Sequence, residues 1–330
     1  MWLSIGLLGS LARASAHPAG RGRTTLLRLS SSDSSSSVVK SLLEPRDVIG
    51  APSGSFRFVD GSFHMNKTRD AAGEYQKERI PGARWLNIDA VADKSTSLPH
   101  MLPSDDDFGK AMDSLGLCND DHVVVYTTQQ CFSAARVWWT FRAFGHSRVS
   151  ILNGGLEAWR RNGGEIETSP APSAFESSRS KAPYKARLDK RLVVDWREVR
   201  GIVDTGSAQI FDARSLARFL AEAPEPRPGL IGGHIPGSLP LPYTVLVQAD
   251  DPTTFRTPTE MRDALQDAGV VFGSRVVATC GSGVTAAVIA FALEQLGKDL
   301  ASAPIYDGSW SEWGDAVLSK ERDLPIVNKK

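Results

Sequence analysis

The strongest chemical signal in the sequence is a cysteine followed by a short glycine-rich loop. Cys280 ends the apolar run 276–279, and Gly281, Ser282 and Gly283 separate it from an alanine-rich run. This order predicts a buried strand, a tight loop and a helix, with Cys280 at the carboxyl end of the strand. Successive backbone N–H groups of such a loop and the helix N-terminus stabilise negative charge. The loop therefore favours a reactive Cys280 thiolate, and a buried, inert cysteine is the alternative.

Three cysteine chemistries could use such a loop. A cysteine phosphatase needs an arginine five residues into the loop to grip phosphate, and residues 281–286 contain none. A cysteine protease needs a histidine partner, and no family signature around Cys280 supports one. Sulfur transfer needs a thiolate that carries a persulfide, in a small loop whose N–H groups hold the anionic outer sulfur. The pattern favours sulfur transfer.

Composition narrows the class of protein. The chain has 330 residues, 41% of them hydrophobic, and a formal net charge of zero. That length is enough for two domains, and the charge favours neither a nucleic acid nor a membrane as partner. The three cysteines (Cys118, Cys131 and Cys280) are far apart and the six histidines are scattered. We therefore expect no disulfide scaffold and no metal site.

The N-terminal stretch has its own composition. Residues 1–32 contain four arginines and no acidic residue, and serines follow. This pattern predicts a mitochondrial transit peptide over residues 1–36, with the protein in the matrix. A secretory signal is the alternative, because residues 2–11 are apolar. It is disfavoured because no basic residue precedes the apolar stretch. A cytoplasmic form without the leader stays open.

The rest of the chain carries one pattern twice, at an offset of about 152 to 155 residues. Each copy alternates short β-branched runs with helical stretches, which predicts an α/β domain with a central parallel sheet flanked by helices. We expect domains at 37–167 and 192–323, joined by a Ser- and Pro-rich linker at 168–191. The matching segments are 58–60 with 210–212, 80–83 with 235–238, 122–137 with 276–289, and 153–159 with 307–313.

The repeat assigns the chemistry to one copy. Ser133 aligns with Thr285, so Thr128 occupies the position of Cys280 and the first domain is predicted to be non-catalytic. Cys131 aligns with Gly283, and a redox role for it stays open as a disfavoured alternative. Cys118 is expected in an exposed loop.

Several longer motifs carry a family resemblance. The chain resembles the two-domain rhodanese-type sulfurtransferases, and within them the 3-mercaptopyruvate type, over about residues 37–323. The resemblance implies two tandem rhodanese-like domains, an active site between them, catalysis by the C-terminal cysteine, and no metal or organic cofactor. The motifs are Asp212-Ala213-Arg214, Pro224-Glu225-Pro226-Arg227, Gly233-His234-Ile235-Pro236-Gly237, residues 280–285 and Tyr306-Asp307-Gly308-Ser309-Trp310.

Charges around the loop indicate the sulfur donor. Thiosulfate sulfurtransferases typically carry Cys-Arg-Lys-Gly, whereas here Gly281 and Ser282 are neutral. The resemblance implies that Arg218 and Arg227 hold the carboxylate and keto oxygen of 3-mercaptopyruvate, whose planar carboxylate suits a guanidinium fork. The remaining loop residues, Gly281, Gly283, Val284 and Thr285, are implied to line the substrate. Arg214 is expected to pair with a carboxylate of its own domain instead.

The resemblance also implies a relay that removes the proton of the donor thiol. Its members map to Ser282, His100 and Asp89, with His100 as the general base. The implied acceptors are cyanide, a small thiol, or a thioredoxin-like dithiol that would release hydrogen sulfide. Two alternatives stay open: a thiosulfate:cyanide sulfurtransferase, and a non-catalytic sulfur carrier or redox sensor.

Overall fold

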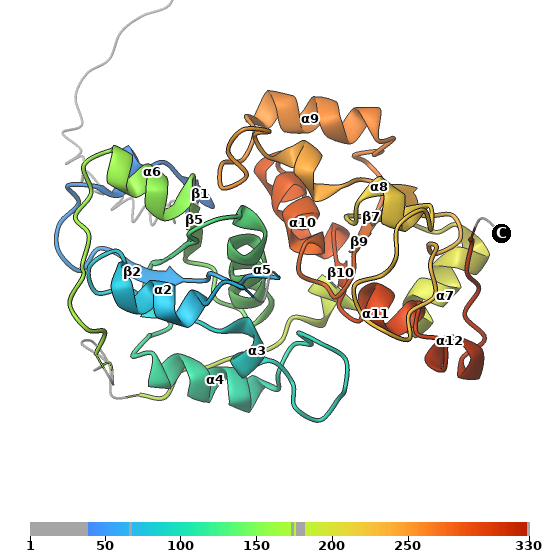
Figure 1. Cartoon of the computed structure of the whole chain (residues 1–330), viewed down its shortest axis with the longest axis horizontal. Helices are drawn as coiled ribbons and strands as arrows, with labels where there is room; N and C mark the ends of the chain where they lie inside the picture. The colour runs from blue at the N-terminus through green and yellow to red at the C-terminus, as the bar shows by residue number, and fades with distance from the viewer. Residues whose placement is uncertain (1–38, 66–67, 173–174, 176–181, 329–330) are drawn as a thin grey trace, which may run out of the picture. The chain divides into compact units, whose positions relative to one another are not determined.

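The computed structural model describes residues 39–65, 68–172, 175 and 182–328 (Figure 1). The predicted transit peptide lies outside the described residues. The predicted linker lies partly outside them, and its described part packs on the first half of the chain. There Tyr184 is buried, its ring 6.0 Å from that of Phe108, and its N–H donates to Asp113 Oδ1 at 2.8 Å.

Two five-stranded sheets organise the chain, and all their strand pairs are parallel. The first sheet has the order β1-β5-β4-β2-β3 and the second β6-β10-β9-β7-β8. The first is built from β1 (Leu42–Leu43), β2 (Arg57–Asp60), β3 (Arg84–Trp85), β4 (Val123–Tyr126) and β5 (Val149–Leu152). The second is built from β6 (Val193–Val194), β7 (Gln209–Asp212), β8 (Leu239–Pro240), β9 (Val276–Thr279) and β10 (Ile305–Tyr306).

The two strand orders become identical when β6 to β10 take the places of β1 to β5. Registers agree too, because Asp60 pairs with Tyr126 as Asp212 pairs with Thr279. The predicted fold class is thereby confirmed: two collinear α/β halves, each with a parallel sheet. The domain limits at 37–167 and 192–323 remain a prediction.

Helices cover the sheets, and several begin at the signals the sequence carries. In the second half, α9 (Pro258–Asp267) begins with a capping box between Thr257 and Glu260. The other helices there are α7 (Trp196–Thr205), α8 (Leu216–Phe219), α10 (Ala286–Gln295), α11 (Ser309–Trp313) and α12 (Leu318–Glu321). The first half has α1 (Pro45–Val48), α2 (Ala71–Lys77), α3 (Ile88–Val91), α4 (Asp105–Ser114), α5 (Cys131–Ala143) and α6 (Gly155–Arg161). Short 3₁₀ turns are η1 (Lys190–Leu192), η2 (Tyr243–Leu246) and η3 (Leu300–Ser302).

The two halves meet where α5 packs against α10. The rings of Trp138 and Phe291 cross there edge to face, with centroids 4.9 Å apart. Both helices are apolar on nearly every face, so each must be buried on all sides, and one hydrophobic core runs through both halves. Because α5 follows β4 and α10 follows β9, this packing brings the loop after each of these strands towards the boundary between the halves.

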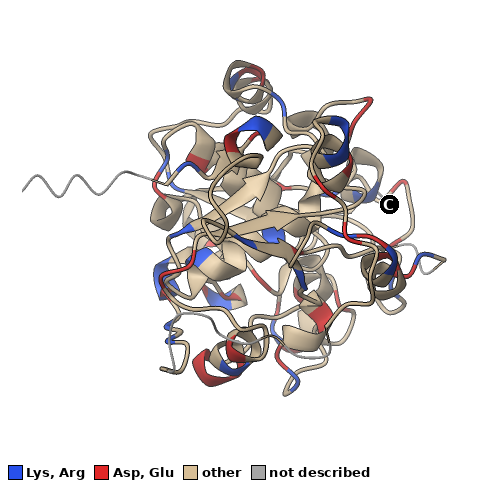
Figure 2. Ribbon diagram, turned by 90° about the vertical axis from the view of Figure 1, so that its left-hand side faces the viewer, with Lys and Arg blue, Asp and Glu red and all other residues tan. Residues whose placement is uncertain are grey.

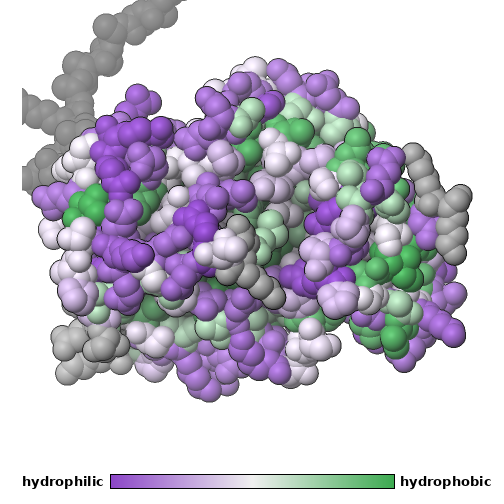
Figure 3. All heavy atoms as spheres, in the orientation of Figure 1, coloured by the Kyte–Doolittle hydropathy of each residue, from purple (hydrophilic) through white to green (hydrophobic). Residues whose placement is uncertain are grey.

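In the ribbon of Figure 2, the positions of basic and acidic residues are interspersed along the chain, in keeping with the net charge of zero. Figure 3, in the orientation of Figure 1, shows mostly hydrophilic residues on this face of the molecule, with apolar residues near its middle. No helix among the described residues is long and apolar enough to cross a membrane.

Candidate active site

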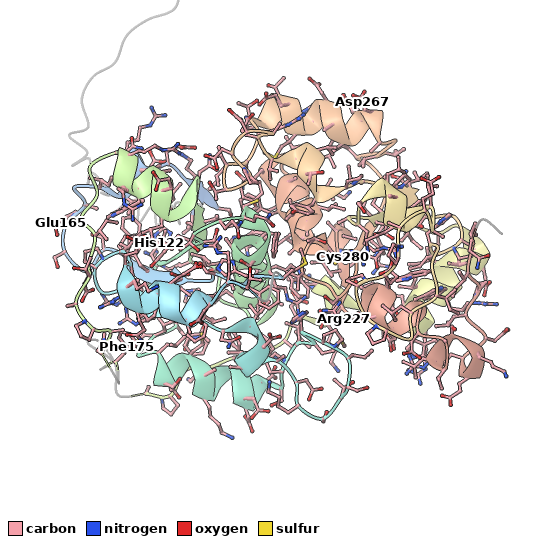
Figure 4. The ribbon with its side chains drawn as sticks, viewed as in Figure 1. His122, Glu165, Phe175, Arg227, Asp267 and Cys280 are labelled. Atoms are coloured by element: carbon pink, nitrogen blue, oxygen red, sulfur yellow. The ribbon has the colours of Figure 1, made fainter. Side chains whose placement is uncertain are left out.

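Cys280 lies where the sequence predicts it, directly after β9 and before the loop that leads to α10. Its side chain is buried, with the residue 2% exposed. Figure 4 places it near Arg227, at the boundary between the two halves. The predicted strand, loop and helix are therefore present, and Thr285 occupies the N-cap position of α10 without a side-chain capping hydrogen bond.

A serine that sequence reasoning missed holds the Cys280 loop. Backbone N–H groups of Cys280 and Gly283 both donate to Ser309 Oγ at 3.1 Å, and the Ser309 hydroxyl donates to Tyr306 O at 2.7 Å. Ser309 has a φ of +50°, which is strained for a residue with a side chain. The Gly308-Ser309-Trp310 motif carried this signal. One hydroxyl thus fixes both ends of the loop.

The two glycines of the loop, Gly281 and Gly283, differ in the space that surrounds them. Gly283 has a φ of +73°, and a Cβ there would lie 2.8 Å from Asp307 O and 2.9 Å from Arg136 Nη1. A Cβ on Gly281 would meet only the Nη2 end of Arg218, at 3.1 Å. Gly283 is therefore required by both backbone conformation and space, whereas Gly281 leaves room for the Arg218 head group to lie along the loop.

A chain of buried charges sets the position of Arg218. Arg214 pairs with Asp212 at 2.6 Å and with Glu225 at 2.9 Å, which confirms its expected structural role. Glu225, whose side chain is 1% exposed, also accepts from Arg218 Nη2 at 2.6 Å. Glu225 stands in the Pro-Glu-Pro-Arg motif but received no role from the sequence. Its carboxylate fixes the Arg218 guanidinium beside Gly281.

Arg227 differs from Arg218 because it forms no ion pair with any acidic residue in the described parts of the chain. Its Nη2 lies 3.2 Å from His100 Nε2 and 3.5 Å from Ser282 Oγ. Within the described parts of the chain, no carboxylate oxygen comes within 4.0 Å of this guanidinium. Burial lowers the pKa of Arg227 and the nearby Arg218 lowers it further, whereas Cys280, Asp89 and Glu225 oppose the shift. A half-buried cation with no described carboxylate in ion-pair contact can bind an anion.

His100 and Asp89 meet as the predicted relay requires. His100 Nδ1 lies 2.7 Å from Asp89 Oδ1, an ion-pair distance that departs from good hydrogen-bond alignment. Burial lowers the pKa of His100, Arg136 and Arg227 lower it further, and the Asp89 carboxylate opposes them. A guanidinium can only donate, so Nε2 of His100 is the accepting nitrogen and the imidazole is neutral. A neutral buried imidazole can accept a proton.

The predicted site residues are thus brought together from both halves. Cys280 and residues 281–285 form the loop, Arg218 lies along it, and Arg227 touches both His100 and Ser282. The arrangement differs from the prediction in one respect. His100 and Ser282 were expected to face each other directly, whereas the Arg227 guanidinium contacts both of them. Sequence reasoning also gave no role to Arg136 and Asp307, which form a buried ion pair of 2.6 Å between the halves.

The other cysteines show no comparable surroundings. Cys131 is buried at the start of α5, and burial strongly raises the pKa of its thiol. Cys118 lies in a loop as expected, but it is half-buried rather than exposed. Over the residues that the structure describes, no cluster of His, Cys, Asp and Glu could hold a metal ion. A pocket of about 690 Å³ in the first half, beside Phe58, Arg84 and Trp159, contains none of the predicted site residues.

Comparison with known proteins gives a consistent family. Residues 67–162 and 195–316 match the Rhodanese-like domain family. The chain is 41% identical to 3-mercaptopyruvate sulfurtransferase of Escherichia coli K12, over 78% of the chain and 86% of that protein. It is 38% identical to mitochondrial thiosulfate/3-mercaptopyruvate sulfurtransferase 1 of Arabidopsis thaliana, over 82% and 73%.

Solved structures agree with these matches. The crystal structure of the Tum1 protein from Saccharomyces cerevisiae superposes with a TM-score of 0.77 at 30% identity, covering 88% of the chain and 98% of that protein. The motifs, the doubled sheet topology and the matched sequences lead to one conclusion. The chain belongs to the family of two-domain rhodanese-like sulfurtransferases, as its sequence predicted.

Proposed function

We propose that this sulfurtransferase moves sulfur from 3-mercaptopyruvate through a persulfide on Cys280. The observation that carries the donor assignment is Arg227, a half-buried cation without a carboxylate partner among the described residues, 3.5 Å from Ser282. A monoanionic 2-keto acid supplies the missing counter-ion. The neutral Gly281 and Ser282 offer no cations for the second charge of thiosulfate. The printed names of the relatives include both donors, so the loop chemistry decides between them.

Substrate binding divides between the two arginines. Arg227 would take the carboxylate, and Arg218, held by Glu225 beside Gly281, would donate to the keto oxygen. The backbone of Gly281, Gly283, Val284 and Thr285 would surround the transferred sulfur. Fixing both ends of a small substrate orients its sulfur towards Cys280, and orientation of this kind accounts for much of an enzyme's rate.

The first half-reaction transfers the donor's sulfur to Cys280. The Cys280 thiolate attacks the donor sulfur, the new S–S bond forms as the C–S bond breaks, and the electron pair of that bond enters the pyruvate enolate. The donor's thiol proton passes to neutral His100 by way of Ser282, and Asp89 stabilises the imidazolium that results. That proton then moves to the enolate carbon, leaving pyruvate and a Cys280 persulfide anion, which the loop N–H groups stabilise.

The second half-reaction regenerates the thiolate. Cyanide attacks the outer sulfur and leaves as thiocyanate, with the S–S electron pair returning to Cys280. A thiol acceptor would instead take the sulfur as a persulfide. A thioredoxin-like dithiol would then close its own disulfide and release hydrogen sulfide.

The protein's location follows from the N-terminal stretch. We infer that residues 1–36 direct it to the mitochondrial matrix, supported by four arginines and no acidic residue in residues 1–32. The Arabidopsis relative is itself named mitochondrial. Residues 1–36 fused to a fluorescent reporter should carry it into mitochondria, and a secreted reporter would contradict this. A cytoplasmic form would require synthesis without the leader.

A donor comparison tests the proposed function. The kcat/KM values for 3-mercaptopyruvate and for thiosulfate are measured side by side with cyanide as acceptor. We expect 3-mercaptopyruvate to be preferred, and mass spectrometry of the donor-treated protein to find one added sulfur on Cys280. Cys280→Ser should abolish both turnover and the added sulfur. A preference for thiosulfate would overturn the donor assignment, and turnover by Cys280→Ser would overturn the nucleophile. A persulfide on Cys280 without turnover would indicate a sulfur carrier.

A further inference from the structure

A buried ion pair joins the two halves beside the Cys280 loop. Arg136 on α5 pairs with Asp307, which follows β10, at 2.6 Å between Nη1 and Oδ1. Both side chains are only 3% exposed. The guanidinium also lies over the Trp139 ring, 4.7 Å from its centroid. Such a pair is poor evidence for stability alone, because desolvation offsets much of the attraction. The role of the pair is therefore indicated by the other hydrogen bonds that Arg136 and Asp307 form.

One set of those bonds goes to the loop that carries the base. Arg136 Nη2 donates to His100 O at 2.5 Å, and the backbone N–H of Leu102 donates to Asp307 Oδ2 at 2.8 Å. His100 has a φ of +62°, in the left-handed region, which is uncommon and strained for a residue with a side chain. A strained residue persists only when its surroundings hold it. Here the ion pair holds the backbone on both sides of Met101.

The other set of bonds goes to the loop that carries the nucleophile. Arg136 Nη1 donates to Gly283 O at 3.1 Å, and Gly283 has no room for a Cβ between Asp307 and this guanidinium. Asp307 also stands two residues before Ser309, whose hydroxyl accepts from both Cys280 N and Gly283 N. The same ion pair thus contacts both the base loop and the nucleophile loop.

We propose that Arg136 and Asp307 are positioning residues, which fix His100 and Cys280 relative to each other across the boundary between the halves. The inference rests on the proposed function, since a base is needed only for a donor that carries a thiol proton. Neither residue touches the donor. Each acts through the backbone of the loops that do.

The charge of Arg136 has a second effect, on the proton affinity of the base. The groups that face His100 are Asp89 from α3, Arg136 from α5, Arg227 from the segment after α8 and the Phe63 ring. Burial lowers the pKa of His100, and Arg136 lowers it further. Removing the Arg136 charge should raise the pKa of His100, and the acid limb of the pH profile should move to higher pH. A merely structural role would not move this limb.

The test compares Arg136→Gln, Arg136→Lys and Asp307→Asn with the unaltered full chain. Glu294→Gln serves as the matched control, because Glu294 accepts a 2.6 Å hydrogen bond from Ser41 across the same boundary, at the far end of α10. The kcat and KM values are measured for 3-mercaptopyruvate and for thiosulfate, which has no thiol proton. Thermal unfolding of each variant is recorded alongside.

We expect Arg136→Gln and Asp307→Asn to lose about 100-fold in kcat with 3-mercaptopyruvate, the size of effect that a 1 Å misplacement produces. The KM for this donor should stay within about threefold, a change worth less than 1 kcal/mol. Thiosulfate turnover should fall by less than about tenfold, because it needs no base. Arg136→Gln should also move the acid limb upwards. Arg136→Lys keeps the positive charge, so the acid limb of its pH profile should stay in place while its kcat falls in part.

Several results would overturn the positioning role. If kcat fell equally with both donors, the ion pair would have only a structural role. The same conclusion would follow if Glu294→Gln lost as much kcat as the ion-pair variants. An unmoved acid limb in Arg136→Gln would refute the electrostatic part. Should Arg136→Gln not fold, Arg136→Lys and Asp307→Asn still decide, because full activity in either contradicts the proposal. The donor preference of the unaltered protein tests the proposed function, and the ratios of variant to unaltered rates test the ion pair.

Discussion

The role of Arg227 leads to a prediction whose size follows from the structure. Arg227→Ala removes a guanidinium that bonds to His100 and Ser282 and pairs with no carboxylate among the described residues, so no buried acid is left alone. Two charge-assisted hydrogen bonds to the substrate carboxylate contribute about 3 kcal/mol at the lower end of their range, which is about 100-fold in kcat/KM. Arg227→Lys keeps the charge without the fork and should lose about tenfold.

The pH profile adds an independent measurement. Arg227 is one of the two cations that lower the pKa of His100, so Arg227→Ala should raise that pKa towards the ordinary value for histidine. His100 can act as a base only above its pKa. The acid limb of kcat/KM should therefore move to higher pH in Arg227→Ala and stay in place in Arg227→Lys.

The assay is cyanide-dependent turnover of 3-mercaptopyruvate by the two variants, followed as a function of pH. Arg197→Ala is the control, because Arg197 is an exposed arginine on α7 that pairs with Asp195 at 3.5 Å and lies over the ring of Trp196, away from the predicted site residues. A kcat/KM for Arg227→Ala within about threefold of the unaltered protein, less than 1 kcal/mol, would refute the assignment of Arg227 to the carboxylate. A large loss with an unmoved limb would refute its electrostatic influence on His100.

Three further predictions concern the loop and the buried carboxylates. Gly283→Ala should lower kcat/KM by at least about tenfold, because the new Cβ would meet Asp307. Gly281→Ala should lower kcat/KM less, because its Cβ would meet only the movable guanidinium of Arg218. Equal losses in the two variants would contradict this prediction. Glu225→Gln breaks a buried pairing with two arginines and should lower the free energy of unfolding in urea by about 3–5 kcal/mol, and an unchanged value would contradict it. Burial raises the pKa of Asp60 from 3.8 to about 6, so the folded state binds this proton more tightly and stability falls as pH rises across that window. Ionisation of Asp60 should lower the free energy of unfolding, measured in urea, by about 3 kcal/mol at pH 8 relative to low pH. Asp60→Asn should remove this loss, and a variant whose unfolding free energy still falls across the same pH window would contradict the prediction.

The Asp60 prediction illustrates how the two copies have diverged. Asp212 in the second half has the Arg214 guanidinium as its partner, 2.6 Å away. The repeat places Ser62 at the position of Arg214 in the first half, and Ser62 gives Asp60 neutral hydrogen bonds, one of them from its backbone N–H at 2.9 Å, but no positive charge. The sequence alignment of the copies was sufficient to identify this difference. Its energetic consequence depends on burial, which only the structure provides.

Most of the fold could be predicted because its signals are local and repeated. Alternating β-branched and helical stretches specify a parallel α/β unit, and a collinear repeat specifies that unit twice. The strand and helix around Cys280 followed from an apolar run, two glycines and an alanine-rich run. The resemblance supplied the relay and the two arginines, because those residues stand in short motifs.

Contacts between the halves could not be predicted, because no local pattern records them. Arg136 and Asp307 lie 171 positions apart and look like ordinary members of a helix and a turn. Only the packing of α5 against α10 brings them together and buries them. Glu225 was visible in a motif, yet its link to both Arg214 and Arg218 required their positions in space.

The sequence by itself determined the doubled α/β architecture, and it predicted Cys280 as the nucleophile and a neutral loop that favours a keto-acid donor, since these depend on residue type and local spacing. The tertiary structure alone decided which arginine forms no ion pair with a carboxylate of the described residues. Arg218 and Arg227 are both arginines near one motif, but Glu225 reaches only the first of them. A charge pair depends on a distance of a few ångströms, and that distance is set by the folding of the whole chain.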